Sequence, residues 1–255
     1  MSEDTRVRVS EDTRPKIGDV NVLEAFVGGR GVGKSTLMIS RIMDLRDACD
    51  GHAYILGHSI GPRLPERLPD GRELPIEYHK DLESLGTAAR RRPEKIHVLA
   101  RGDADQLLDY ARKLAEANRR RAYAPLGIGW TPERRMLGKR CEVVIVFVDE
   151  GIAINAADAR AGKDEQRAFR EFLFGLRHEH VALFYNIQNG NARSYILIEQ
   201  ATRIFAFRAR HRWAIEALRA GGLDDDRVAT LRTLAPYHYY VISDDADNAT
   251  EGGPG

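Results

Sequence analysis

Short, strongly apolar runs alternate along the chain with segments whose apolar residues recur every three or four positions. Several of the runs, such as "VVIVFV" at 143–148, contain no polar residue. Continuous runs of this kind are typical of strands that are buried on both faces of a parallel sheet. The predicted strands are residues 21–27, 53–58, 95–100, 142–149, 181–187, 203–209 and 238–243.

The intervening segments have the period of amphipathic helices. They predict helices at residues 34–48, 103–120, 164–176, 212–220 and 224–234. Alternation of strands and helices predicts an α/β fold, in which helices flank a doubly wound, mainly parallel central sheet with extra strands on its C-terminal side. The proline- and glycine-rich residues 61–75 are expected to form a surface loop.

The two ends of the chain differ in composition from its body. Residues 1–18 are polar and charged and are interpreted as a flexible leader, whereas the acidic, glycine-rich residues 244–255 are interpreted as a disordered tail. Residues 19–243 then form one domain. No apolar stretch approaches the roughly 20 residues of a membrane span, and the N-terminus lacks the apolar core of a signal peptide. With Cys49 and Cys141 as its only cysteines, the chain fits a reducing compartment, so we expect a cytoplasmic protein.

The segment "GGRGVGKS" follows the first predicted strand and precedes the first predicted helix. It fits the pattern G-x-x-x-x-G-K-[ST], in which backbone N–H groups and a helix N-terminus hold phosphates. Lys34 is expected to reach the β- and γ-phosphates of ATP, Ser35 to ligate Mg²⁺ and Thr36 to meet the α-phosphate. The predicted nucleotide-binding residues are Gly28, Gly29, Arg30, Gly31, Val32, Gly33, Lys34, Ser35 and Thr36.

A second candidate group follows the apolar strand at 142–149, which ends in the carboxylates Asp149 and Glu150. We predict that this strand lies beside the strand that precedes the phosphate loop, which would place Asp149 at the carboxyl edge, where ligands of open α/β sheets bind. Asp149 would hold Mg²⁺ through a water, and Glu150 would activate the attacking water as a general base. The pair of carboxylates favours ATP hydrolysis over the phosphoryl transfer of a small-molecule kinase.

A third candidate is Gln188, which follows the predicted strand "VALFYNI". An amide at the tip of that strand could orient the attacking water or sense hydrolysis near the γ-phosphate.

Taken in order, "GGRGVGKST", "VVIVFVDE", "RHEHVALFYNIQ" and, after an intervening helix, "TRIFAFR" resemble the FtsK–HerA superfamily of P-loop DNA translocases. The third segment is most similar to genome-packaging ATPases of membrane-containing icosahedral viruses, and it also resembles the zonula occludens toxin family of filamentous phages. One departure is Ile187, which stands before Gln188 where the family more often has a threonine or serine. The resemblance implies a RecA-like (ASCE) P-loop NTPase fold.

The resemblance also implies a function. It suggests an ATP-driven motor that moves double-stranded DNA into a preformed capsid, with capsid or portal vertex proteins as partners, in the host cytoplasm or on the virion. Such motors act as homo-oligomeric rings, usually hexamers, in which a neighbour's arginine completes each ATP site. Arg177 is the first candidate for this arginine, followed by Arg210 and Arg212.

DNA contacts are expected at basic loops, since the net charge of +1 argues against a basic coat over the whole protein. The loop at 121–140 combines arginines and lysines with Tyr123 and Trp130, a composition that suits contact with nucleic acid. His178 and His180 form His-x-His, and on a strand both side chains would face one side as a possible metal pair, but no third metal ligand is apparent. A structural or relay role for His178 beside Arg177 is therefore favoured over a metal site.

Three other functions stay open. The first is a filamentous-phage-type assembly or export ATPase, although such proteins usually carry a membrane span. The second is a nucleotide-dependent switch or scaffold that does not translocate DNA. The third is a small-molecule kinase, which would show phosphoryl transfer without DNA.

Overall fold

The computed structural model describes residues 22–49, 53–59, 64–123, 143–149, 163–178, 181–188, 190, 192–243 and 250–252. The strands are β1 (Leu23–Val27), β2 (Ala53–Ser59), β3 (Ile76–His79), β4 (Ile96–Leu99), β5 (Val143–Asp149), β6 (Val181–Ile187), β7 (Arg203–Phe207), β8 (Tyr239–Ser243) and β9 (Thr250–Gly252). The helices are α1 (Lys34–Ala48), α2 (Leu82–Arg91), α3 (Ala104–Tyr123), α4 (Lys163–His178), α5 (Ala192–Gln200), α6 (Arg212–Ala220) and α7 (Asp225–Leu231).

Within this described part, the strands form one nine-stranded sheet in the order β3-β4-β2-β5-β6-β1-β7-β8-β9. All neighbouring pairs from β3 to β7 are parallel, and β8 and β9 add antiparallel strands beyond β7. Every residue of β1, β2, β5 and β6 is buried, which agrees with their nearly continuous apolar sequences. The predicted α/β fold with extra C-terminal strands is confirmed.

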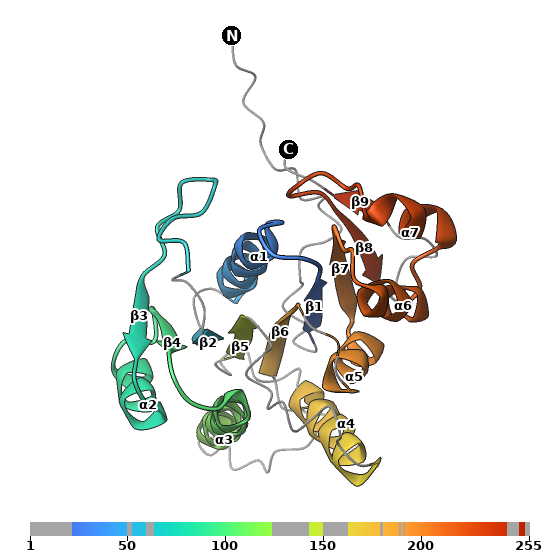
Figure 1. Cartoon of the computed structure of the whole chain (residues 1–255). Helices are drawn as coiled ribbons and strands as arrows, with labels where there is room; N and C mark the ends of the chain where they lie inside the picture. The colour runs from blue at the N-terminus through green and yellow to red at the C-terminus, as the bar shows by residue number, and fades with distance from the viewer. Residues whose placement is uncertain are drawn as a thin grey trace.

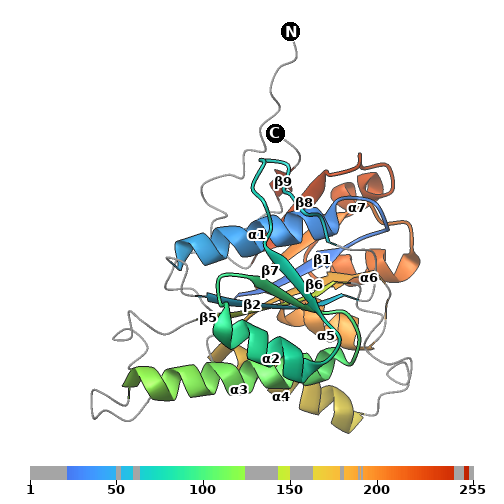
Figure 2. The same cartoon turned by 90° about the vertical axis from the view of Figure 1, so that its left-hand side faces the viewer.

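Helices cover both faces of the sheet (Figure 1), with α1 on one face and α2, α3, α4 and α5 on the other. The quarter-turn view in Figure 2 shows the sheet between α1 and α3. Each face has its own apolar core. Phe26, Phe147 and Phe184 pack on the α1 side, whereas Val146 and Leu183 pack on the opposite side. This alternation along each strand is what a sheet buried on both faces requires.

A buried ion pair joins α1 to the strand before it. Arg41 of α1 binds both carboxylate oxygens of Glu24 on β1, and both side chains are at most 2% exposed. The Arg41 guanidinium also lies 4.9 Å from the centre of the Phe205 ring. The pair therefore fixes the orientation of α1 over the sheet, and with it the direction of the helix N-terminus.

Three parts of the structure differ from the sequence prediction. The edge strand β3 and helix α2 were not predicted, because β3 has four residues and no apolar run. Thr250–Gly252 form β9 against β8, although they belong to the segment predicted as a disordered tail. His178 is the last residue of α4 and does not belong to a strand, while His180 lies outside the described residues.

No helix among the described residues is long and apolar enough to cross a membrane.

Candidate functional site

The candidate site lies at the carboxyl ends of the parallel strands β1, β5 and β6. The prediction that the strand of Asp149 neighbours the strand before the phosphate loop is wrong, since β6 lies between β5 and β1. The register of the parallel pairs nevertheless brings the three strand ends level, with Val27 beside Ile187 and Val148 beside Tyr185. Asp149 therefore reaches the loop across the end of β6.

The backbone of the phosphate loop depends on two of its glycines. Gly28 has a φ of 155°, and a Cβ at this position would lie 2.8 Å from the Cβ of Phe207 on β7. Gly33 has a φ of 99°, and its Cβ would lie 2.4 Å from the ring of Tyr237. Both positions combine an unusual φ with a close neighbour, so only glycine fits without distortion.

The loop is held against the sheet by backbone hydrogen bonds. The N–H of Gly29 donates to the carbonyl of Arg208 over 3.0 Å, and the N–H of Tyr237 donates to the carbonyl of Val32 over 3.0 Å. The segments after β7 and before β8 thus fix the loop from one side. Tyr237 has a φ of 68°, which is uncommon for a residue with a side chain, and the residue is 53% exposed.

The N-terminus of α1 opens into this loop. Gly33 is the N-cap residue and offers no side-chain cap, and the first turn contains no acidic residue. The first N–H groups of a helix without such a cap carry a partial positive charge and can bind an anion. The residues present therefore fit a phosphate group at the start of α1.

Lys34 lies inside the loop and is 4% exposed. Its Nζ donates to the carbonyl oxygen of Gly28 over 3.0 Å and to that of Gly29. A buried ammonium group is stable only with acceptors of this kind. These contacts keep the positive charge within the loop, at the place where the motif predicts phosphate contact.

Ser35 and Asp149 meet across the site. The Ser35 Oγ donates to Asp149 Oδ1 over 2.9 Å, and Asp149 is 6% exposed. A hydroxyl and a carboxylate are oxygen ligands of the type that Mg²⁺ prefers, directly or through water. The oxygen ligands of Ser35 and Asp149 therefore fit the magnesium ion that the motif predicts.

Asn186 is a component of the site that the sequence analysis missed. It lies on β6, is fully buried, and its Nδ2 donates to Asp149 Oδ1 over 2.6 Å and to Ser35 Oγ over 3.2 Å. Its Oδ1 has no hydrogen-bond partner among the residues described. The signal was an asparagine within an otherwise apolar strand, two residues before the predicted Gln188.

The structure brings Gln188 to the loop as well. Its Oε1 accepts a hydrogen bond from Arg30 Nε over 3.3 Å at an exposed position. Gln188 thus lies at the tip of β6 and faces the phosphate loop, with Asn186 deeper in the same strand. Thr36 lies in the first turn of α1.

The structure describes only some of the remaining candidate residues. Glu150 and Trp130 lie outside the described residues, and Tyr123 is the last residue of α3. Arg177 belongs to the last turn of α4. Arg210 is exposed between β7 and α6, whereas Arg212 is the exposed first residue of α6 and pairs with Glu216 over 2.6 Å.

No protein-family model and no curated protein matches the sequence. Solved structures do match. The crystal structure of B204, the DNA-packaging ATPase from Sulfolobus turreted icosahedral virus, has a TM-score of 0.57 at 15% identity, over 92% of this chain and 98% of that chain. The genome-packaging NTPase B204 from Sulfolobus turreted icosahedral virus 2, in complex with ATP-γ-S, has a TM-score of 0.56 over the same shares at 15% identity.

A third match is to EssC (ATPases 2 and 3) from Geobacillus thermodenitrificans, with a TM-score of 0.52 at 10% identity. It covers 92% of this chain but 39% of that one. At identities of 10–15%, the likeness to these structures concerns the fold. The chain has the RecA-like P-loop fold of these ATPases.

Proposed function

We propose that this chain is an ATPase that uses hydrolysis to move double-stranded DNA, as a viral genome-packaging motor does. The observation that carries the proposal is the hydrogen bond between Ser35 and Asp149, which unites the phosphate loop with the carboxylate of a separate strand. A glycine-rich turn without catalytic function would not need a buried carboxylate at this point.

Each residue of the site then has a defined task. The N–H groups at the start of α1 and the Lys34 ammonium bind the phosphates of ATP, and Lys34 exchanges its carbonyl partners for phosphate oxygens. Ser35 and Asp149 would hold Mg²⁺, which when bound would supply positive charge against the phosphates of ATP.

The reaction transfers the γ-phosphoryl group to water. The water oxygen forms a bond to the γ-phosphorus, the bond from this phosphorus to the bridging oxygen breaks, and ADP leaves with that oxygen. Glu150, directly after Asp149 in the chain, takes the proton of the water as general base. Gln188 at the tip of β6 orients the water.

Two observations support DNA as the molecule that this ATPase moves. The B204 protein, which is named as a DNA-packaging ATPase, matches this chain over nearly the full length of both chains. Basic residues also cluster in the sequence at 133–140, "ERRMLGKR", which lies outside the described residues, and at 208–212. The second cluster adjoins the phosphate loop, since the carbonyl of Arg208 accepts a hydrogen bond from the N–H of Gly29. Such clusters suit contacts with phosphates that are independent of sequence. A homo-oligomeric ring would let an arginine of one subunit, with Arg177 as first candidate, complete the site of the next.

The test is the rate of ATP hydrolysis with and without duplex DNA, measured as salt is raised. A DNA translocase is expected to show stimulation by DNA that declines steeply with salt, because its contacts are to phosphates. Turnover that duplex DNA leaves unchanged, at low salt, would reject the translocase. Stimulation by single-stranded DNA alone would favour the filamentous-phage-type export ATPase. Nucleotide binding without turnover would favour a switch or scaffold.

A further inference from the structure

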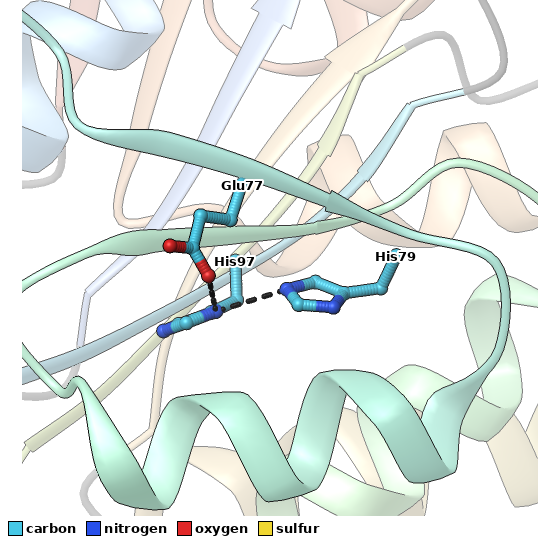
Figure 3. Close-up of side chains that lie close together, drawn as sticks. All are labelled: Glu77, His79 and His97. Carbon is cyan, nitrogen blue, oxygen red and sulfur yellow. Dashed lines mark hydrogen bonds and ion pairs between the residues drawn. The ribbon is translucent and has the colours of Figure 1, made fainter.

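The edge of the sheet that is formed by β3 and β4 holds a cluster of possible metal ligands. Glu77 and His79 lie on the edge strand β3 and His97 lies on its neighbour β4. The parallel register pairs Glu77 with His97, and His79 is two residues beyond Glu77, so all three side chains lie on one face of the sheet. Figure 3 shows them converging from the two strands above a helix.

The spacing of the ligand atoms fits a single ion. His79 Nε2 lies 3.0 Å from His97 Nδ1, and Glu77 Oε2 lies 4.0 Å from the same atom. One ligand atom from each residue can be chosen so that all three lie within 4.8 Å of one another. Two nitrogens bound tetrahedrally to one zinc ion, each at about 2.0–2.1 Å, are roughly 3.3 Å apart. The three side chains are thus close to a coordinating arrangement.

The surroundings of His97 prepare one nitrogen for a metal. Its Nε2 lies 2.9 Å from the carbonyl oxygen of Arg92, which can only accept a hydrogen bond. The proton of the neutral ring therefore belongs on Nε2, and Nδ1 presents its lone pair to His79 and Glu77. A backbone carbonyl that orients the far nitrogen is the usual outer partner of a metal-bound histidine.

Glu77 is held in a similar way. Its Oε1 contacts Lys95 Nζ at 2.6 Å and Arg92 Nη1 at 2.5 Å, whereas its Oε2 is directed toward His97. The two cations thus occupy one carboxylate oxygen and leave the other for a ligand bond. His97 is 1% exposed, while Glu77 and His79 are half-buried, so the cluster opens to solvent on one side.

We propose that Glu77, His79 and His97 bind a divalent transition-metal ion, with Zn²⁺ as the best fit, and that a water or an external ligand completes its coordination. Two imidazoles and one carboxylate suit zinc, cobalt or nickel better than Mg²⁺, which prefers oxygen ligands. The ion would clamp the short edge strand β3 to β4. This site is separate from the phosphate loop, because β1 is four strands beyond β4 in the sheet order.

The test uses the full chain without nucleotide, stripped with a chelator and then titrated with CoCl₂ or ZnCl₂. We expect saturable binding of one ion per chain at this cluster, with visible Co²⁺ absorption bands that ZnCl₂ abolishes by displacement. His79→Ala should weaken binding by about ten-fold or more, because loss of even an outer partner of a metal ligand typically costs about 10–100-fold. The exposed His211 lies elsewhere in the fold, so His211→Ala is the matched control and should bind like the wild type.

Thermal melting provides an independent readout. ZnCl₂ should raise the melting temperature of the wild type and of His211→Ala, because an ion that binds only the folded chain stabilises it. It should not raise that of His79→Ala. Glu77→Gln keeps the side-chain shape and serves as the second variant, with weakened binding expected. Absence of saturable binding by the folded wild type, or equal affinities of the wild type and the folded ligand variants, would overturn the proposal.

Discussion

Asn186 donates a 2.6 Å hydrogen bond to Asp149, and the same nitrogen lies 3.2 Å from the hydroxyl of Ser35. The buried amide of Asn186 thus contacts both residues that are expected to hold Mg²⁺. It belongs to β6, the strand between β5 and β1. We interpret Asn186 as a positioning residue, since it acts on the ion through its two neighbours.

Replacing Asn186 should therefore weaken the magnesium site. We expect Asn186→Ala to lower the affinity for Mg²⁺–ATP by about ten-fold, because outer partners of metal ligands are commonly worth 10–100-fold. The Mg²⁺ dependence of binding of a fluorescent ATP analogue measures this. Asn118→Ala removes another buried asparagine, on α3, and is the matched control. Equal Mg²⁺ dependence in both variants would contradict the assignment.

Gly33 should not tolerate a side chain. Gly33→Ala places a Cβ 2.4 Å from the Tyr237 ring at a φ of 99°, so the loop must shift and nucleotide binding should be lost. In the double variant Gly33→Ala/Tyr237→Ala the steric conflict is removed and the backbone strain remains. We expect partial recovery of nucleotide affinity, measured by calorimetry. Wild-type affinity in Gly33→Ala alone would argue against this loop conformation.

The buried pair of Glu24 and Arg41 predicts an asymmetric effect on stability. Burial lowers the pKa of Arg41, but attraction and hydrogen bonds from Glu24 outweigh it and raise the pKa above its ordinary value, so Arg41 remains charged. Arg41→Met leaves a buried carboxylate without this partner and should cost about 3–5 kcal/mol in urea unfolding. Arg41→Met/Glu24→Leu should recover most of that loss. A double variant no more stable than Arg41→Met would contradict this account.

A neighbour's arginine can be tested by mixing inactive subunits. Arg177→Ala and Lys34→Ala should each abolish hydrolysis, because one lacks the donated arginine and the other lacks the phosphate-binding lysine. In a mixed ring, an Arg177→Ala subunit can retain an intact phosphate loop and receive the arginine from a Lys34→Ala neighbour. We expect partial recovery of ATP turnover on mixing. No recovery at any ratio, with ring assembly verified by light scattering, would exclude Arg177.

The sequence predicted those parts of the site that depend on local spacing. Lys34 and Ser35 belong to a contiguous motif, and Asp149 ends an apolar strand, so both could be recognised without coordinates. The position of β6 between β5 and β1 could not, because strand order depends on packing between segments distant in sequence. Asn186 was missed for this reason, since its importance comes from its neighbours on two other elements.

The cluster of Glu77, His79 and His97 shows the same limit. Its residues come from two short strands with helix α2 between them, and β3 has only four residues and no apolar run. The local sequence pattern does not predict that His79 Nε2 and His97 Nδ1 lie 3.0 Å apart. Only the parallel pairing of β3 with β4 brings them together.

The central claim is that Lys34, Ser35 and Asp149 form one ATP-hydrolysing site, and a single-turnover measurement of ATP hydrolysis tests it most directly. We predict Mg²⁺-dependent release of phosphate by the wild type, with rates at least about 100-fold lower in Lys34→Ala and Asp149→Asn, and a normal rate in Lys113→Ala, which changes an exposed lysine of α3. Phosphate release by Lys34→Ala and Asp149→Asn at the wild-type rate would contradict the account.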